Sequence, residues 1–292
     1  MNRAFAEVIG DPIARSKSPA IHGFWLSQLG IDAEYCATLV TTGELSEWLA
    51  GRRGEPAWRG CNVTMPHKQA IIAHLDRLDP LAAAIGAVNT VVSEGGALVG
   101  YNTDAGGFLE PLSHELSQDH YFRMARVLGA GGAARGIVAA LVREKFLIVL
   151  GARNPAKARA LLEELDPGGD HHAVDLAHFS IPTDFAFDDR AGCLDLVINA
   201  SPLGMRGQPP LIFDWSHAPP SAIGYDIVTD PLETPFLISA VHAGHRVIDG
   251  LSMLIGQAAL AFERFFGAPA PRQYDNELRT LLASSQAAGP QQ

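Results

Sequence analysis

The sequence predicts an α/β fold with two domains, and three observations support this prediction. With 292 residues, the chain is long enough for two domains of ordinary size. Strand-like apolar segments alternate with segments of helical spacing, the order that builds a mostly parallel sheet. A glycine-rich turn at residues 129–135, GAGGAAR, lies between a predicted strand and a predicted helix. This turn is typical of a Rossmann-type dinucleotide-binding domain, so the α/β segment before it is expected to form a separate N-terminal domain with a mostly parallel sheet.

The expected elements follow from apolar periodicity and turn residues. In the first domain we expect a strand at 4–9, a helix at 20–29, a strand at 34–40, a strand ending near 62, helices at 43–51, 66–75 and 80–85, and a hairpin with strands at 90–93 and 97–101. In the second we expect a connecting helix at 105–116, strands at 126–128, 146–150, 195–199, 221–228 and 246–249, and helices at 133–143, 234–243 and 252–266.

The composition limits the partners that the chain can bind. The formal net charge is −10 and the sequence pI is about 5.5. Nucleic acid and anionic membranes require a basic patch, so neither is an expected partner, whereas a small anionic substrate needs only a few local donors. The N-terminal segment lacks the apolar core of a signal peptide, and no run of roughly 18 apolar residues occurs, so we expect a cytoplasmic protein. The 3 cysteines are far apart and fit no metal-ligand spacing.

Two serines precede the first predicted helix. Ser18-Pro19 reads as an N-cap followed by proline at the first helical position, and Ser16 lies two residues earlier. Their hydroxyls and the free backbone N–H groups of the first turn suit a carboxylate or a phosphate. Ser18 alone would be most simply a helix cap, and the second serine favours a ligand role.

Further polar side chains lie where strands end. Taken alone, Lys68 would be a solvent-exposed charge in a strand–helix turn, with Thr64 as an N-cap and Pro66 in the first helical turn. Strand ends in an α/β sheet can converge on one edge, however, and that edge is where ligands bind. The junction residues that we expect to converge there are Ser16, Ser18, Asn62, Thr64, Lys68, Asn89 and Asp104.

The end of the second strand of the glycine-rich unit predicts the choice of dinucleotide. An NAD site would place an acidic residue there for the ribose 2′-hydroxyl, but no acid occurs before Glu163. Arg153 and Lys157 are present instead and can pair with a 2′-phosphate, which favours NADP. The alternative, two solvated cations at a helix N-terminus, is disfavoured because they would oppose the helix dipole.

These segments together resemble the shikimate dehydrogenase family from about residue 8 to residue 266. The blocks that carry the resemblance are GDPIARSKSPAIH at 10–22, NVTMPHK at 62–68, GAVNT at 86–90, NTD at 102–104, GAGGAAR at 129–135, NASPLGM at 199–205, YDIV at 225–228 and GLSMLIGQA at 250–258. The resemblance implies an NADP-dependent, reversible reduction of 3-dehydroshikimate to shikimate, a step of chorismate and aromatic amino-acid biosynthesis. It also implies a discontinuous substrate domain, residues 1–104 plus 251–292, with the cofactor domain at 105–250.

The family's functional residues carry over by position. The catalytic pair matches Lys68 and Asp104. The substrate ligands match Ser16, Ser18, Thr64, Asn89, Asp104, Tyr225 and Gln257. The nicotinamide-lining positions match Gly250 and Met253, and the glycine-rich and basic motifs add Gly129, Ala130, Gly131, Gly132, Ala133, Arg153 and Lys157 as cofactor residues. For Gln257, which lies among apolar helix residues, a purely structural amide is the alternative.

The chemistry of such a reaction agrees with a lysine at the site. A secondary alcohol that gives up a hydride must also lose its hydroxyl proton, so a base has to lie within hydrogen-bond reach of that oxygen. In the reverse direction a cation stabilises the developing alkoxide. Because a lysine can serve both directions, no metal is needed, and no histidine or cysteine cluster predicts one.

Two departures from the family pattern leave alternatives open. Arg15 stands where the family usually has histidine, and residues 152–154 read Ala-Arg-Asn where the family's phosphate motif usually reads Asn-Arg-Thr. The second departure removes one phosphate donor. A quinate/shikimate dehydrogenase with broader substrate choice or NAD use is therefore one alternative, and a catalytically silent ligand-binding homologue is another. A monomer or homodimer is expected.

Overall fold

The computed structural model describes residues 3–188 and 191–287, and the chain divides into two compact units. The first unit joins Met1–Gly107 to Ile255–Gln292, and the second unit is Phe108–Leu254. The boundaries predicted from the sequence lie after residues 104 and 250. Each unit is built on its own six-stranded sheet. The prediction of an α/β fold that includes a Rossmann-type domain is confirmed.

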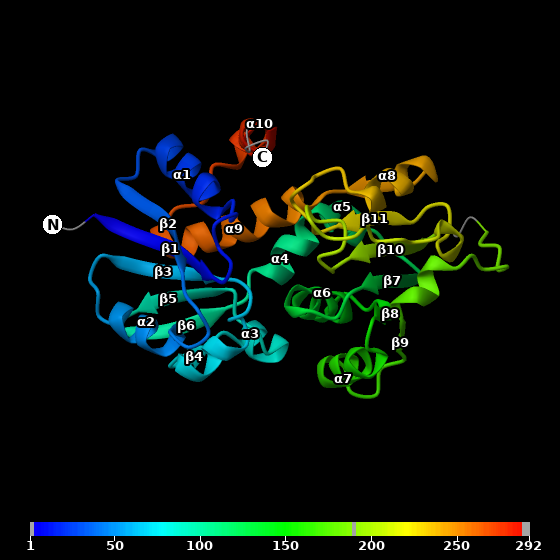
Figure 1. The fold of residues 1–292 in the computed structure, drawn as a ribbon, viewed down its shortest axis with the longest axis horizontal. Coiled ribbons are helices and arrows are strands. Elements are labelled where there is room, and N and C mark those ends of the chain that lie inside the picture. Colours follow the sequence, from blue (N-terminus) through cyan, green and yellow to red (C-terminus); the bar gives the residue numbers. More distant parts are fainter. Residues whose placement is uncertain (1–2, 189–190, 288–292) are drawn as a thin grey trace. The chain divides into compact units, whose positions relative to one another are not determined.

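The sheet of the first unit places its strands in the order β2-β1-β3-β5-β6-β4 (Figure 1). Its strands are β1 (Ala4–Gly10), β2 (Ala33–Leu39), β3 (Trp58–Val63), β4 (Arg77–Leu78), β5 (Thr90–Glu94) and β6 (Ala97–Tyr101). β1 runs parallel to both β2 and β3, whereas the hairpin strand β5 runs antiparallel to β3 and β6. The carboxyl ends of β1 and β3 therefore lie at the same edge of the sheet, as predicted for their junction residues.

Helices cover both faces of this first sheet. In Figure 1, α1 (Ser18–Leu29) and the C-terminal part of α9 (Gly250–Phe266) lie on one face, with α10 (Asp275–Ala287) beside α1. The other face carries α2 (Leu45–Arg52), α3 (Pro80–Ile85) and the short 3₁₀ helix η1 (Ala70–His74). On that face a core of buried side chains includes Leu49 of α2, Ile71 of η1 and Val91 of β5. Burial of these apolar side chains holds the helices against the sheet.

The α-helix predicted at 66–75 is wrong. After β3, residues 65–69 form turns, and only Ala70–His74 is helical, as a 3₁₀ helix. One reason is a tertiary bond: the backbone carbonyl of Lys68 accepts from Val88 N at 2.8 Å, so it is committed to a partner outside its own segment. The buried His67 ring is likewise held, with Nε2 2.6 Å from the Val40 carbonyl oxygen. Tertiary contacts have overridden local helix propensity here.

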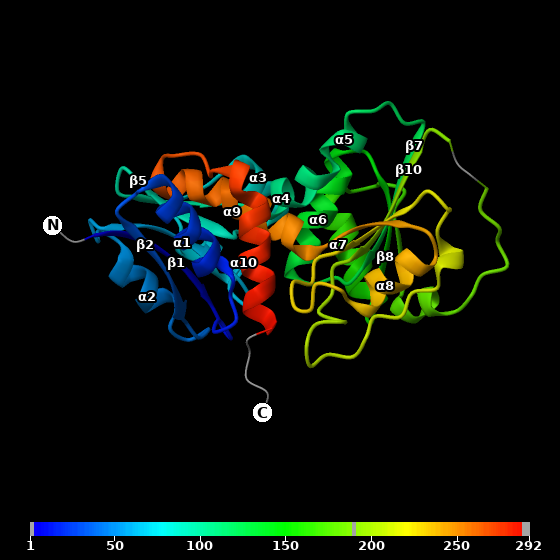
Figure 2. The same ribbon diagram turned by 90° about the horizontal axis from the view of Figure 1, so that it is seen from above.

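The sheet of the second unit is wholly parallel, in the order β12-β11-β10-β7-β8-β9. Its strands are β7 (Phe122–Leu128), β8 (Leu147–Ala152), β9 (His172–Asp175), β10 (Cys193–Asn199), β11 (Ile223–Asp226) and β12 (Arg246–Ile248). Counted from β7, this is the strand order of a Rossmann domain, whose ligand crevice opens where the order reverses, between β7 and β10. Figure 2 shows β7, β8 and β10 of this sheet from above.

The helices of the second unit include α6 (Gly132–Arg143), α7 (Pro155–Leu165) and α8 (Pro235–His242). The connecting helix predicted at 105–116 is divided into α4 (Asp104–Leu109), a 3₁₀ turn η2 (Glu110–Leu112) and α5 (Ser113–Leu116). Strand β9 was not expected. His171, directly before it, has a side chain that is 7% exposed, and its ring accepts from Ile148 N at 3.2 Å. Further short 3₁₀ helices are η3 (Leu176–Ser180), η4 (Trp215–His217) and η5 (Arg272–Tyr274).

In the described parts of the chain, no helix combines the length and apolarity required to cross a bilayer. Within residues 3–188 and 191–287, no group of histidine, cysteine and acidic side chains is arranged to hold a metal ion.

Candidate active site

Lys68 and Asp104 form an ion pair at the edge of the first sheet. Lys68 lies in the turn after β3, Asp104 is the first residue of α4, and Lys68 Nζ is 2.6 Å from Asp104 Oδ2. The lysine side chain is 14% exposed and the aspartate side chain 8%. Because little water reaches the pair, each charge stabilises the other more than on an open surface, while the small exposed fraction leaves room for a ligand.

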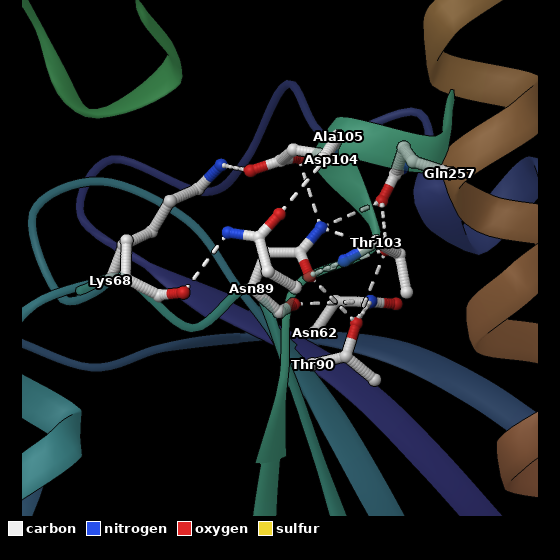
Figure 3. A network of polar contacts seen from close by, with 10 residues as sticks. Asn62, Lys68, Asn89, Thr90, Thr103, Asp104, Ala105 and Gln257 are labelled. Carbon is white, nitrogen blue, oxygen red and sulfur yellow. Dashed lines mark hydrogen bonds and ion pairs between the residues drawn. The ribbon is translucent and has the colours of Figure 1, made fainter. Parts of the chain in front are cut away.

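Asn89 lies at the centre of the site (Figure 3). Its side-chain oxygen accepts from the backbone N–H of Thr103 at 2.7 Å. Since a backbone N–H can only donate, this bond determines which end of the amide is oxygen. The amide nitrogen then donates to Asp104 Oδ1 at 2.9 Å and to Thr103 Oγ1 at 2.8 Å. Asn89 therefore holds one carboxylate oxygen of Asp104 while Lys68 holds the other.

Gln257 reaches the same site from α9. Figure 3 shows Lys68 and Gln257 on opposite sides of Asn89. The Gln257 side-chain oxygen accepts from Thr103 Oγ1 and from Asn89 Nδ2, both at 3.3 Å. A glycine permits this approach, because a Cβ at Gly107 would lie 2.4 Å from the Gln257 backbone nitrogen. Because Gly107 has no side chain, α4 and α9 can lie close enough for Gln257 to reach the hydrogen bonds around Asn89.

The serine pair lies at the start of α1 with a small shift from the prediction. The helix begins at Ser18 with Lys17 as the N-cap, so the prediction of Ser18 as the cap is wrong by one residue. Ser16 Oγ accepts from the backbone N–H of Ser18 at 3.3 Å, which gives Ser16 the capping bond. The Ser18 side chain is 7% exposed and lies near the Tyr35 hydroxyl. Among the described residues, neither serine is hydrogen-bonded to Lys68 or Asp104.

Thr64 lies directly after β3, where two strand ends approach closely. Its backbone N–H donates to the Ile9 carbonyl at 2.9 Å. A Cβ at Gly10 would lie 2.4 Å from the Thr64 methyl group, so the glycine at the end of β1 makes room for this side chain. Thr64 itself is half-buried, which leaves part of its side chain open to a ligand.

The glycine-rich turn of the second unit lies between β7 and α6. Gly129 has φ +119°, a conformation that favours glycine, and a Cβ there would lie 2.9 Å from the Ala200 carbonyl oxygen. Gly131 is the N-cap of α6 and Gly132 its first residue, and neither would meet another atom within 4 Å if it carried a Cβ. Together with Ala130 and Ala133, they leave open space in front of the N–H groups of the first helical turn. Such a cradle fits a pyrophosphate.

The basic residues predicted to select the dinucleotide follow β8. Arg153 and Lys157 are both exposed, at the start of α7. Asn154 is the N-cap of that helix, and its side chain accepts from Lys157 N at 3.2 Å. The asparagine is thus engaged in capping, and the two cations remain the charged groups that this turn offers to a 2′-phosphate.

A buried carboxylate organises the loops that follow β10 and β11, and the sequence did not single it out. Asp226 is fully buried, and burial raises the pKa of its carboxyl above the usual value. It accepts from Asn199 Nδ2 at 3.0 Å, from Val228 N at 2.9 Å and from Thr234 Oγ1 at 2.6 Å. Three segments at the carboxyl edge of this sheet are thereby joined. The YDIV block contains Asp226, but its local pattern does not reveal these partners.

The remaining predicted residues also lie in the second unit. Tyr225 is fully buried, its ring stacks on Phe108 at 4.9 Å, and burial raises the pKa of its hydroxyl. That hydroxyl donates to the Phe108 carbonyl at 3.4 Å. A Cβ at Gly250 would lie 2.2 Å from the Val228 carbonyl oxygen, and Met253 is 7% exposed. The roles of Tyr225, Gly250 and Met253 stay predictions.

Two family models match the chain. One, described as the shikimate dehydrogenase substrate binding domain, matches residues 8–91. The other, described as the shikimate 5′-dehydrogenase C-terminal domain, matches residues 250–277. The second match covers the part of α9 that carries Gln257.

Known proteins resemble the chain over nearly its whole length. It is 49% identical to a shikimate dehydrogenase (NADP(+)) of Sphingopyxis alaskensis, with 96% of this chain and 97% of that protein covered. The solved shikimate 5-dehydrogenase of Thermus thermophilus, in complex with NADP(H) and shikimate, is 36% identical with a TM-score of 0.79, covering 96% of this chain and 99% of that one. A quinate dehydrogenase from Corynebacterium glutamicum in complex with NAD is 28% identical with a TM-score of 0.81, covering 96% and 99%.

Proposed function

The chain belongs to the shikimate dehydrogenase family, and we propose that it catalyses the reversible, NADP-dependent reduction of 3-dehydroshikimate to shikimate. The observation that carries this proposal is the contact between Lys68 Nζ and Asp104 Oδ2 at 2.6 Å, braced by Asn89. An alcohol–ketone interconversion needs one proton-transfer group beside the reacting oxygen, and this pair supplies it. In aromatic amino-acid biosynthesis, the reaction would make shikimate from its 3-keto precursor.

The first unit would bind the substrate through its polar edge. Ser16 and Ser18, at the start of α1, are the groups that we assign to the substrate carboxylate. Thr64, Asn89, Asp104 and Gln257 present hydroxyl, amide and carboxylate groups to the ring hydroxyls, and Tyr225 is assigned to the substrate from the family pattern alone. A buried polar site of this kind rejects analogues that lack a hydroxyl, because its own groups would be left unpaired.

Lys68 would carry the proton. The cofactor would supply the hydride chemistry when bound, with NADPH as the hydride donor for reduction and NADP(+) as the hydride acceptor for oxidation. In the direction of reduction, the Lys68 ammonium donates its proton to the carbonyl oxygen and stabilises the charge that develops there. In the direction of oxidation, Lys68 takes the hydroxyl proton. Asp104 holds the amino group in place in both directions, and Asn89 holds Asp104.

The second unit would hold the dinucleotide. The open cradle of Gly131 and Gly132 fits a pyrophosphate at the N-terminus of α6. Arg153 and Lys157 would pair with the 2′-phosphate and so select NADP over NAD. Gly250 and Met253 are assigned to the nicotinamide.

A quinate/shikimate dehydrogenase that uses NAD is the second candidate. It is favoured by one observation, that Asn154 caps α7 where the family usually places another phosphate donor after the arginine. A catalytically silent homologue is disfavoured, because the Lys68–Asp104 contact is intact. We further propose a cytoplasmic protein, monomeric or homodimeric, that binds no nucleic acid and no membrane.

Steady-state assays with two substrates and two cofactors test the proposal. The purified chain would be given shikimate or quinate, each with NADP or NAD, and kcat/KM would be measured for the four combinations. We expect the highest value for shikimate with NADP. A higher kcat/KM with NAD or with quinate would support the second candidate, and shikimate binding without turnover in any combination would support the silent homologue.

A further inference from the structure

The hydrogen bonds around Asn89 continue away from Lys68 and Asp104, through Thr90 and Asn62, to Tyr35. Asn62, at the end of β3, is 5% exposed, and Tyr35, in β2, is 7% exposed. The Tyr35 hydroxyl donates to Asn62 Oδ1 at 2.6 Å. The sequence predicts Asn62 among the junction residues that converge at this edge, without a role of its own, whereas Tyr35 lies in no motif and was not predicted.

The bonds of Asn62 have a fixed direction. Its oxygen accepts from Tyr35, so its amide nitrogen faces the other way and donates to Thr90 Oγ1 at 3.0 Å. The fully buried Thr90 hydroxyl lies 3.1 Å from Asn89 Oδ1 and donates to it. Asn89 in turn donates to Asp104 at 2.9 Å. Figure 3 shows the part of this chain from Asn62 to Asp104.

The other end of this series of hydrogen bonds lies near Ser18, one residue of the serine pair. The Ser18 side chain lies close enough to the Tyr35 hydroxyl to affect its pKa. Burial raises the pKa of Tyr35 well above its usual value, so the hydroxyl remains a protonated donor. The Tyr35 hydroxyl thus lies near Ser18 and donates to Asn62.

The Tyr35 ring has a separate packing role. It stacks on the His22 ring, with centroids 4.0 Å apart and planes at 2°, and it contacts Phe265 with centroids 6.3 Å apart. These contacts belong to the ring and not to the hydroxyl. A phenylalanine at this position would keep them, which allows the hydrogen bonds to be tested apart from the packing.

We propose that Tyr35 is a positioning residue, whose hydroxyl fixes Ser18 for the substrate carboxylate and, through Asn62, Thr90 and Asn89, fixes Asp104 for the proton transfer. The inference rests on the proposed function, because that function assigns Ser18 to the substrate and Asp104 to catalysis. Without the Tyr35 bond, the Asn62 side-chain oxygen loses its donor, and the amide is held only by the bonds of its nitrogen to Thr90 Oγ1 at 3.0 Å and to the Asn89 carbonyl oxygen at 3.3 Å. Such networks act together, so one missing bond affects groups several bonds away.

Tyr35→Phe is the variant that tests this inference. We expect kcat/KM for shikimate to fall about ten-fold, the effect of roughly one lost hydrogen bond. KM for NADP should stay close to the wild-type value, because no cofactor group is changed. The thermal midpoint should fall by roughly a few degrees, because the ring packing is retained and only Asn62 Oδ1 loses its donor. The matched control is Tyr101→Phe, which removes a hydroxyl that donates to Glu94 on the surface of the same unit. The control should leave all shikimate parameters unchanged.

A double-mutant cycle tests whether the effect passes through Asn62. If the two residues act in one chain, Tyr35→Phe combined with Asn62→Ala should lose less activity than the sum of the two single losses in free energy. Strict additivity would contradict the chain and leave Tyr35 acting on Ser18 alone.

The possible results separate this inference from the proposed function. Wild-type turnover of shikimate with an unchanged Tyr35→Phe variant would overturn the positioning role and leave the function standing. A wild-type chain without turnover would overturn the function. Shikimate binding, measured by calorimetry on both proteins, would then still decide the role of Tyr35: the inference requires weaker binding by Tyr35→Phe than by the wild type.

Discussion

His22 is fully buried, and neither of its ring nitrogens has a hydrogen-bond partner among the described residues. Its ring lies between Tyr35 and Phe262, with centroid distances of 4.0 Å and 5.8 Å. Burial in this aromatic cluster lowers the pKa of His22 from 6.5 to about 3. The imidazole is therefore neutral in the folded protein throughout the physiological pH range, and its role is to pack against the positioning tyrosine.

This histidine should make the stability of the first unit depend on pH. The unfolded chain takes up a proton near pH 6.5, whereas the folded chain does so only near its lowered pKa of about 3. The unfolded state therefore binds more protons between these values, so the contribution of His22 is complete above 6.5 and is lost as the pH falls. Between about pH 7.5 and about pH 5.5, the loss is roughly 1.4 kcal/mol in the free energy of unfolding.

Urea unfolding of the wild type and of His22→Phe at these two pH values measures the difference. Trp25 lies beside His22, with ring centroids 5.8 Å apart, so its fluorescence reports on this region. The variant should lose less stability on acidification than the wild type by about that 1.4 kcal/mol. An equal loss in both proteins would mean that another group dominates the titration.

At the scale of residues, the sequence predicted which polar groups lie together better than how they are held. Lys68, Asn89, Asp104 and Gln257 were expected to converge, and the structure bonds them together. Tyr35 and Thr103 were missed because their partners come from strands and helices far away in the sequence. Thr103 adjoins Asp104 in the NTD block and could have been included, whereas nothing local marks Tyr35.

Gly107 shows how an element can depend on an absent side chain. It lies in α4 against α9, and a Cβ there would lie within 2.6 Å of the Gln257 Cβ and closer still to its backbone nitrogen. Backbone atoms cannot move aside as a flexible side chain can. The position of α9, and with it the contribution of Gln257 to the site, therefore depends on this glycine.

Gly107→Ala should separate α4 from α9. We expect a loss of roughly 1–3 kcal/mol in stability together with a higher KM for shikimate, because Gln257 would be displaced. The matched control is Gly23→Ala in α1, where the added Cβ meets nothing within 4 Å. That exposed helix position should gain about 0.5–1 kcal/mol. Thermal unfolding of the two variants checks that their stability changes have opposite signs, and steady-state kinetics checks KM for shikimate. A Gly107→Ala protein with unchanged stability and unchanged KM would show that the contact between α4 and α9 does not depend on this glycine.

The predicted elements differ from the observed ones where tertiary bonds compete with local preference. Long periodic segments were predicted well, since α6 and the hairpin of β5 and β6 lie within a residue or so of their expected bounds. The α-helix expected at 66–75 was wrong because the Lys68 carbonyl oxygen accepts from the backbone N–H of Val88, outside its own segment. Strand β9 was missed because it pairs only with β8 at the edge of the sheet and carries little apolar pattern.

At the scale of the whole molecule, a local sequence pattern predicts the Rossmann domain, whereas no local pattern predicts that the chain returns to the first unit. The glycine-rich turn predicts a Rossmann domain because its strand, turn and helix are contiguous, and the observed order of β9-β8-β7-β10-β11-β12 follows. The return of the chain to the first unit at residue 255 has no such local pattern. Only the resemblance to a family implied it, since periodicity describes one element at a time and not which unit it joins.

Charge sets a further constraint on the whole chain. With a net charge of −10, the protein repels anions at long range, yet both proposed ligands are anionic. Binding must then rest on local donors, namely the serine pair in one unit and the glycine cradle with Arg153 and Lys157 in the other.

The central claim is that Lys68, held by Asp104, transfers the proton in shikimate oxidation and reduction. The most direct measurement compares kcat and shikimate affinity for the wild type and Lys68→Met, with Lys145→Met in the second unit as the matched control. We expect kcat to fall about 100- to 10,000-fold in Lys68→Met, the usual contribution of a general acid–base, while shikimate binding measured by calorimetry changes little and Lys145→Met behaves as the wild type. A Lys68→Met protein that keeps its folding and retains kcat within a few-fold of the wild type would contradict the account.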